Sequence, residues 1–135
     1  MKYFLQKDGD NDTPLHCASH SGKHEVVSLL VEKGALLNEI NTKGFTPLIY
    51  AVMGRHAKTC QILAKKGAKV NSFDKTVAPI LIATQNGDLP VCRILVKYKA
   101  DLNVVSFIAI VLLPFLFIQY RRISALLWQE KLTES

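Results

Sequence analysis

The hydrophobic positions of the first hundred residues recur in short bursts with helical spacing. In the first unit, Leu15 and Ala18 lie three residues apart and share one face of a helix. A second burst begins after a break at Gly22, and its apolar residues predict a stripe along a second helix. That stripe consists of Val26, Val27, Leu29 and Leu30. The pattern therefore predicts two short helices joined by a turn.

The residues that flank these bursts carry the usual signals for helix ends. Thr13 can cap the first helix, because its side-chain oxygen can accept a hydrogen bond from the first turn. Pro14 follows at a place where a helix needs no N–H donor. Gly34 comes after the second burst, and glycine readily adopts the left-handed conformation found just beyond a helix end. We therefore expect both helices to lie between Thr13 and Gly34.

The whole pattern repeats, first after 33 residues and then after 32. The stretch DTPLHCASHSGKHEVVSLLVEKGALLN (12–38) returns as FTPLIYAVMGRHAKTCQILAKKGAKVN (45–71) and as VAPILIATQNGDLPVCRILVKYKADLN (77–103). The third unit has no counterpart of Gly44, so its turn is one residue shorter. Because self-similarity at a fixed period of this length marks stacked supersecondary units, the sequence predicts a solenoid.

Several motifs make this chain similar to the ankyrin-repeat family. They are TPLH at 13–16, TPLI at 46–49, and the Gly-Ala pairs at 34–35 and 67–68. The resemblance covers 8–103 and implies an all-α, helix-turn-helix solenoid with short hairpin loops. Its repeats would span about 8–40, 41–73 and 74–103. The third repeat departs from the pattern: it has APIL at 78–81 and Lys99 in place of glycine, and Pro90 fits only within the first turn of a helix.

Three segments lie outside the repeats. Residues 1–7 look like the remnant of an earlier unit or an N-terminal cap helix. Residues 104–122 form a hydrophobic segment that we expect to be helical, and 123–135 form a polar tail. The hydrophobic segment contains fifteen almost unbroken apolar residues, from Val104 to Ile118, and ends in Arg121 and Arg122.

Three interpretations of the hydrophobic segment remain open. A helix of fifteen residues rises only about 22 Å, short of the roughly 30 Å core of a bilayer, although the stretch 102–120 reaches about 28 Å. As a cap on the third repeat, the segment would bury one side and expose the other, and Pro114 would divide it. Alternatively, the chain is a truncated variant of a longer ankyrin protein. The repeat stops at Asn103, and a Val-Ser pair follows at 105–106, as a common splice-donor sequence would encode.

The charge and the cysteine content indicate which class of partner and which cellular compartment to expect. The formal net charge is +6, but the lysines and arginines are spread along the chain without a dense run, so no nucleic-acid partner is expected. Three cysteines without paired spacing, in a chain without a secretory signal, indicate reduced thiols. We therefore expect a cytoplasmic protein, with membrane association through 104–122 as the open alternative.

The sequence contains no recognisable catalytic or cofactor-binding motif, and we expect a protein that is not an enzyme. The alternating acidic residues from Asp8 to Asp12 lack the glycine and the glutamate of a calcium-binding loop. His16, His20 and His24 are spaced four apart, but the break at Gly22 places them on two helices, which disfavours a zinc site. No cofactor and no metal ion are therefore expected.

Two further roles follow from the position of residues within the repeats. The resemblance implies that the ring of His16 bridges backbone groups of neighbouring repeats. Cys60 and Cys92 occupy the place that Val27 has in the first repeat, so we expect them to be buried and to act as small hydrophobic side chains.

The resemblance also implies that the hairpin tips and the ends of the first helices face a partner. The expected partner-binding residues are Asp10, Asp12, His20 and Ser21 in the first repeat, Lys43, Phe45 and Met53 in the second, and Lys75, Val77, Gln85 and Asn86 in the third. Phe45 and Met53 have the composition of an interface hot spot, whereas the alternative for Phe45 is packing on a neighbouring hairpin. The sequence thus predicts a non-enzymatic protein–protein interaction module. The alternatives are a membrane-anchored adaptor with 104–122 in the bilayer and the truncated variant.

Overall fold

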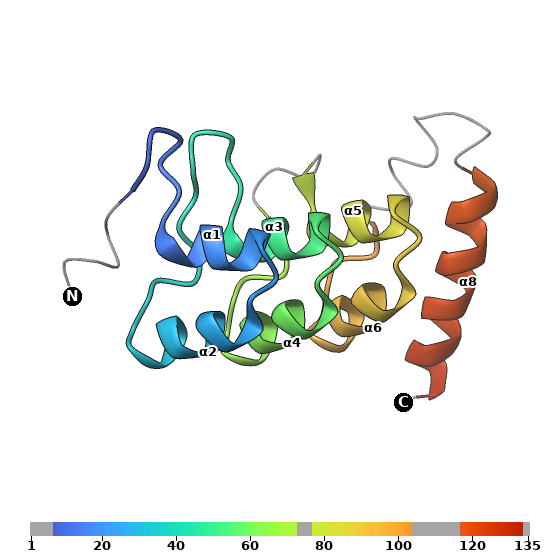
Figure 1. Ribbon diagram of the computed structural model, residues 1–135. Coiled ribbons are helices and arrows are strands. Elements are labelled where there is room, and N and C mark those ends of the chain that lie inside the picture. The colour runs from blue at the N-terminus through green and yellow to red at the C-terminus, as the bar shows by residue number, and fades with distance from the viewer. Residues whose placement is uncertain (1–6, 73–76, 104–116, 134–135) are drawn as a thin grey trace.

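The computed structural model describes residues 7–72, 77–103 and 117–133, and its regular elements there are helices. Three helix-turn-helix repeats follow one another along the chain (Figure 1). Their helices are α1 (Pro14–His20) and α2 (His24–Glu32), α3 (Pro47–Met53) and α4 (Ala57–Lys65), and α5 (Pro79–Gln85) and α6 (Leu89–Lys97). A longer helix, α8 (Phe117–Thr133), follows the repeats. The predicted all-α repeat architecture is thereby confirmed.

The first helices begin where the sequence predicted. The side-chain oxygen of Thr13 accepts a hydrogen bond from the backbone N–H of His16, and Pro14 occupies the first turn of α1. Thr46 caps α3 in the same way. In the third repeat Ala78 stands at this position, and α5 begins without a side-chain cap. Because the apolar residues of α5 are buried against neighbouring helices, packing replaces the missing cap.

The helix ends explain two departures of the third repeat. Gly34 and Gly67 follow α2 and α4 with φ of 94° and 102°, and Lys99 adopts φ of 67° at the equivalent place. The substitution of glycine by lysine has therefore kept the left-handed turn, at a strain of about 1 kcal/mol. Pro90 lies in the first turn of α6, where the helix tolerates it, as expected.

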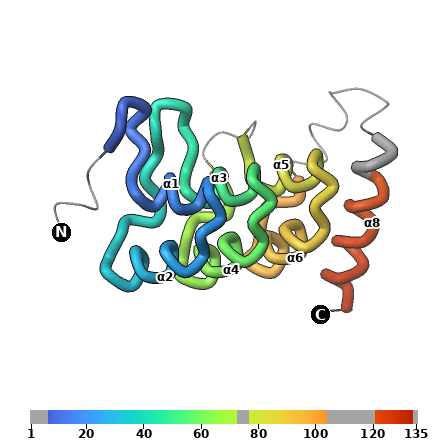
Figure 2. The backbone as a smooth tube through the Cα atoms, viewed as in Figure 1, coloured from blue at the N-terminus to red at the C-terminus, as the bar shows by residue number. Residues whose placement is uncertain are grey.

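The helices form two rows, with α1, α3 and α5 in one and α2, α4 and α6 in the other (Figure 2). The core runs between the rows. Val27, Cys60 and Cys92 occupy equivalent positions in the second row and are all fully buried, as the repeat register predicted. Since each repeat contributes the same few positions to this core, the core is continuous along the array.

The apolar stripe predicted for α2 is only half correct. Val27 is fully buried, but Val26 is 43% exposed and Leu29 is 54% exposed. The residues equivalent to Val26 in the later repeats are Thr59 and Val91, which are 1% and 0% exposed, because the preceding repeat covers them. In the part of the chain that the structure describes, no helix covers that face of α2.

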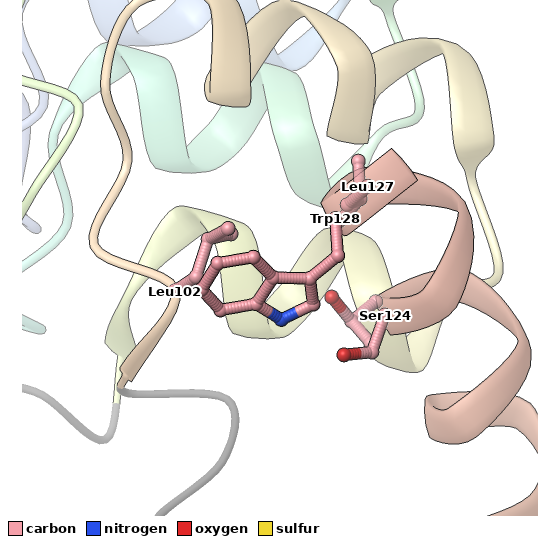
Figure 3. A pocket seen from close by; sticks show the side chains of 5 residues that line it. Leu102, Ser124, Leu127 and Trp128 are labelled. Carbon is pink, nitrogen blue, oxygen red and sulfur yellow. The ribbon is translucent and has the colours of Figure 1, made fainter. Parts of the chain in front are cut away.

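Helix α8 covers the last repeat. Ile123 and Leu127 are 6% and 3% exposed and belong to the same core as the repeats, and the helix packs on both α5 and α6. Arg93 of α6 forms an ion pair with Glu130, with 2.7 Å between Nε and Oε1. Figure 3 shows Trp128 reaching toward Leu102 at the edge of this contact.

Helix α8 spans the boundary between the hydrophobic segment and the polar tail that the sequence indicates at 122–123. Residues 123–133 continue α8, and two of their apolar residues one turn apart, Ile123 and Leu127, face the third repeat. Most of the hydrophobic segment, 104–116, lies outside the described residues, as do residues 1–6 of the proposed remnant or cap. Among the helices that the structure describes, none has the length and apolar character needed to cross a bilayer.

Candidate functional site

The candidate site is the surface formed by the hairpin loops and the C-terminal ends of the first helices (Figure 1). Six of the predicted partner-binding residues are exposed and form what we call the inner surface: Asp10, His20, Ser21, Lys43, Met53 and Gln85. Four others are half-buried, namely Asp12, Phe45, Val77 and Asn86, and Lys75 lies outside the described residues. All three repeats therefore contribute exposed residues to the inner surface.

Side-chain oxygens inside the loops hold the first two hairpin tips in shape. Oδ1 of Asp8 accepts two backbone N–H groups of the loop that follows it, each at 2.9 Å, and Oδ1 of Asn41 does the same 33 residues later. The two tips are also joined directly, because the N–H of Thr42 donates to the carbonyl of Asp10 at 3.0 Å. These bonds fix the backbone from which Asp10 and Lys43 project.

A polar network beneath the tips engages Asp12. The side-chain amide of Asn41 donates to Oδ1 of Asp12 at 2.8 Å and to the hydroxyl of Tyr50 at 2.9 Å. The hydroxyl of Tyr50 in turn donates to Oδ2 of Asp12 at 3.3 Å. Burial of the ring and the nearby Asp12 carboxylate raise the pKa of Tyr50, which keeps the hydroxyl protonated as a donor. The carboxylate of Asp12, in the first repeat, thus accepts hydrogen bonds from two side chains of the second repeat and holds the two repeats together.

His16 links the same two repeats, as the resemblance implied. Its side chain is fully buried, and Nε2 lies 2.9 Å from the carbonyl oxygen of Phe45 in the second repeat. Because a carbonyl only accepts, Nε2 carries the proton and Nδ1 is the acceptor. Nδ1 receives the backbone N–H of Thr13 at 3.1 Å, and the Thr13 hydroxyl lies 2.8 Å from it.

Tyr50 is the centre of an aromatic cluster on the inner surface. The rings of His16, His20 and Phe45 meet it edge to face, with centroids 6.0, 5.1 and 5.7 Å away. Phe45 is therefore half-buried against Tyr50 of its own repeat, whereas Met53, one turn of helix beyond Tyr50, is 45% exposed. The cluster forms a rigid floor, and Met53 is its exposed apolar neighbour.

His56 is a contributor that the sequence analysis missed. Its Nε2 donates to the carbonyl oxygen of His20 at 3.0 Å, across the first two repeats. The imidazole also fills the space beside two glycines, because a Cβ at Gly22 or Gly54 would lie about 2.5 Å from the ring. The sequence did contain a signal for this role, because Gly22 and Gly54 lie 32 residues apart and the large side chain of His56 follows two positions after Gly54.

The described residues also include three thiols and one cluster of potential metal ligands. Burial raises the pKa of Cys60 to about 12 and that of Cys92 to about 11, so neither thiol is a nucleophile at neutral pH. Asp8, Asp12 and Cys17 place potential ligand atoms within 4.8 Å of one another. Both carboxylates, however, already accept hydrogen bonds, and burial raises the pKa of the Cys17 thiol, which disfavours the thiolate that a metal ion needs.

Comparison with known proteins identifies the class. The family model for ankyrin repeats, built from three copies, matches residues 1–74 and 45–106. These matches cover most of the chain, and the chain therefore belongs to the ankyrin-repeat family. Proteins built from these repeats are generally protein–protein interaction modules rather than enzymes.

Several curated relatives share the repeats. An ankyrin repeat protein of fowlpox virus is 36% identical over 104 residues, which is 75% of this chain and 30% of the viral protein. The mouse B-cell lymphoma 3 protein homolog is 38% identical over 91 residues, which is 66% of this chain and 20% of that protein. The human ankyrin repeat and KH domain-containing protein 1 is 34% identical over 102 residues, 73% of this chain and 4% of its own length. The chain thus spans less than a third of each of these relatives.

Proposed function

We propose that this chain binds a protein partner through its inner surface and performs no catalysis itself. The observation that carries the proposal is the exposed Met53 beside the fixed cluster of Tyr50, Phe45 and His20. A flexible thioether next to aromatic rings suits an apolar side chain of a partner. The charged tips, with Asp10 and Lys43, would form the polar rim around it.

The rigidity of the surface supports this assignment. The tips of the first two repeats are tied by backbone and side-chain hydrogen bonds, and the ends of their first helices are tied by His56. A surface that is already ordered loses little conformational entropy when it binds. The same residues that stack the repeats therefore prepare the binding surface.

The test is a binding measurement with matched variants of the full chain. Peptides would be selected from a display library against the wild type, and their Kd values measured for Met53→Arg and for Leu29→Arg. Leu29 is similarly exposed but lies on α2, away from the inner surface. We expect Met53→Arg to weaken binding at least about tenfold and Leu29→Arg to leave it unchanged, because burying an unpaired charge in an interface is unfavourable. Equal Kd values for the two variants would refute the assignment to the inner surface.

Two further expectations accompany the proposal. Two deeply buried thiols with raised pKa values suit a reducing cytoplasm, which we propose as the compartment. The apolar run from Val104 to Ile118 supports a second candidate function, attachment of the array to a membrane. Carbonate extraction of a membrane fraction tests it, because an inserted segment stays with the lipid and a cap on the third repeat does not. A chain released into the supernatant would contradict insertion.

A further inference from the structure

Lysines that are far apart in the sequence lie close together on the row formed by α2, α4 and α6. Lys65 and Lys66 stand at the end of α4, and Lys97 and Lys99 stand at the end of α6. The two helices pack side by side in the same row (Figure 1). We call these four exposed residues the basic ridge. Neighbouring helices pack about 8–10 Å apart, so the charges lie within about one Debye length of each other.

The ridge belongs to a strongly one-sided distribution of charge. Between His56 and Lys99, the described residues include seven basic side chains and a single acidic one, Asp88. The first repeat carries Glu32 at the place of Lys65 and Lys97, so the fold does not require a lysine there. Lys33 does occupy the place of Lys66, so the basic ridge differs from the end of the first repeat by Lys65, Lys97 and Lys99.

The ammonium group of Lys97 lies 5.8 Å from the ring centroid of Tyr98, but among the described residues the charges of the ridge are not paired with carboxylates. The ion pairs within the described ranges join Lys7 to Glu39, Lys43 to Asp10 and Arg93 to Glu130. In those ranges, no carboxylate pairs with a lysine of the ridge. Four neighbouring like charges repel one another, and an anionic surface would relieve that repulsion.

We infer that the basic ridge docks on the anionic surface of a lipid bilayer. The chain leaves the third repeat a few residues after Lys99 and enters the apolar run 104–118, and exposed Arg121 and Arg122 follow it. A lysine cluster next to an apolar segment is the pattern that anionic phospholipids attract. One weak apolar contact and one basic patch together give stable attachment where neither suffices alone.

The position of the ridge suits this role. It lies at the ends of the second helices, whereas the inner surface is formed by the hairpin loops and the first helices (Figure 1). Binding through the ridge would leave the inner surface open to a partner. The inference does not depend on partner binding at the inner surface, but the choice of lipid over another polyanion draws on the apolar segment.

The experiment measures binding of the full chain to phosphatidylcholine vesicles with and without phosphatidylserine. The ridge variant combines Lys65→Gln, Lys66→Gln, Lys97→Gln and Lys99→Gln. The control variant combines Lys7→Gln, Lys23→Gln, Lys43→Gln and Lys131→Gln, which removes the same charge elsewhere. We expect the ridge variant to bind the serine-containing vesicles at least about tenfold more weakly, and the control to lose much less. Added NaCl should abolish the difference, because the attraction is screened.

Three results would overturn the inference. The first is an equal loss of vesicle affinity in the ridge variant and the control variant. The second is a wild-type affinity that is the same for vesicles with and without phosphatidylserine. The third is a ridge variant that loses RNA or duplex DNA binding while its vesicle binding is unchanged. Insertion of 104–118 is a separate matter, since it would persist without phosphatidylserine and at high salt. Urea midpoints check folding, and if the fourfold variant unfolds, the pairs Lys65→Gln/Lys66→Gln and Lys97→Gln/Lys99→Gln must each show a smaller loss in the same direction.

Discussion

The junction between the first two repeats differs in chemistry from the junction between the second and the third. At the first junction, buried His16 donates to the carbonyl of Phe45, and Asn41 and Tyr50 both bond to Asp12. At the second junction, the place of His16 is taken by Ile49, which is also fully buried but apolar. In the described part of the second junction, the N–H of Asp101 donates to Asn71 at 2.8 Å, as that of Lys69 does to Asn38 at the first junction. The side-chain amide of Asn86 also donates to the carbonyl of Val52, at 3.5 Å.

The difference teaches how a repeat array tolerates a degenerate unit. Directed hydrogen bonds at the first junction fix the hairpin tips relative to one another, which is where the inner surface lies. Apolar burial at the second junction needs only complementary shape and keeps the third repeat stacked without TPLH. A third junction, between the third repeat and α8, is apolar as well, with Ile123 and Leu127 buried.

The largest expected effect concerns the apolar junction with α8. Leu127→Ala should destabilise the protein by about 2–5 kcal/mol, because it leaves a cavity beside the third repeat. Leu132→Ala is the matched control, since Leu132 is 74% exposed on the same helix and should change stability by less than about 0.5 kcal/mol. Urea unfolding measures both. If the two variants unfold at the same midpoint, α8 does not hold the third repeat.

A similar effect is expected when the polar junction is made apolar. His16→Leu should destabilise by about 2–4 kcal/mol, because the Thr13 N–H and the Phe45 carbonyl would both lose a buried partner. Ile49→Leu introduces the same side chain at the equivalent position of the second repeat and should destabilise by less than about 1.5 kcal/mol, because one buried apolar side chain replaces another of equal volume. Chemical denaturation of the two variants compares the junctions directly. Equal losses would show that the two junctions do not differ as described.

The smallest expected effect is a loss of folding stability at alkaline pH, and it arises in the apolar core that both junctions share. Burial raises the pKa of Cys60 from 9.0 to about 12 and that of Cys92 from 9.0 to about 11. The folded state therefore favours the neutral thiols. Their contribution to stability is complete below pH 9 and is lost as the pH rises toward 11–12, because only the unfolded chain ionises. By about pH 10 the loss should reach about 1 kcal/mol per thiol.

A valine variant isolates this contribution. Val27 occupies the equivalent place in the first repeat, so Cys60→Val combined with Cys92→Val should fold and should lose less stability between pH 8 and pH 10 than the wild type. Tyr50 titrates in both proteins and cancels in the comparison. Identical losses in urea unfolding for the two proteins would contradict a role for the thiols.

Much of the inner surface was predictable from the sequence, but its supports were not. The 33-residue register placed Asp10, His20, Lys43 and Met53 correctly on exposed positions. It did not show that Asp12 is engaged with Asn41 and Tyr50, because that network depends on two hairpins lying side by side. The role of His56 was missed for the same reason, since its ring acts on the preceding repeat.

The sequence by itself determined the repeats, their helix pairs and their ends. Caps such as Thr13 and turns such as Gly34 act on residues only a few positions away, so the local sequence is enough to predict them. Only the tertiary structure decided which apolar residues are covered, because equivalent positions such as Val26 and Val91 differ in what lies beside them. The tertiary structure also decided that α8 packs on the third repeat and that lysines far apart in the sequence lie together in the basic ridge. These outcomes depend on contacts between segments far apart in the chain, which no local pattern records.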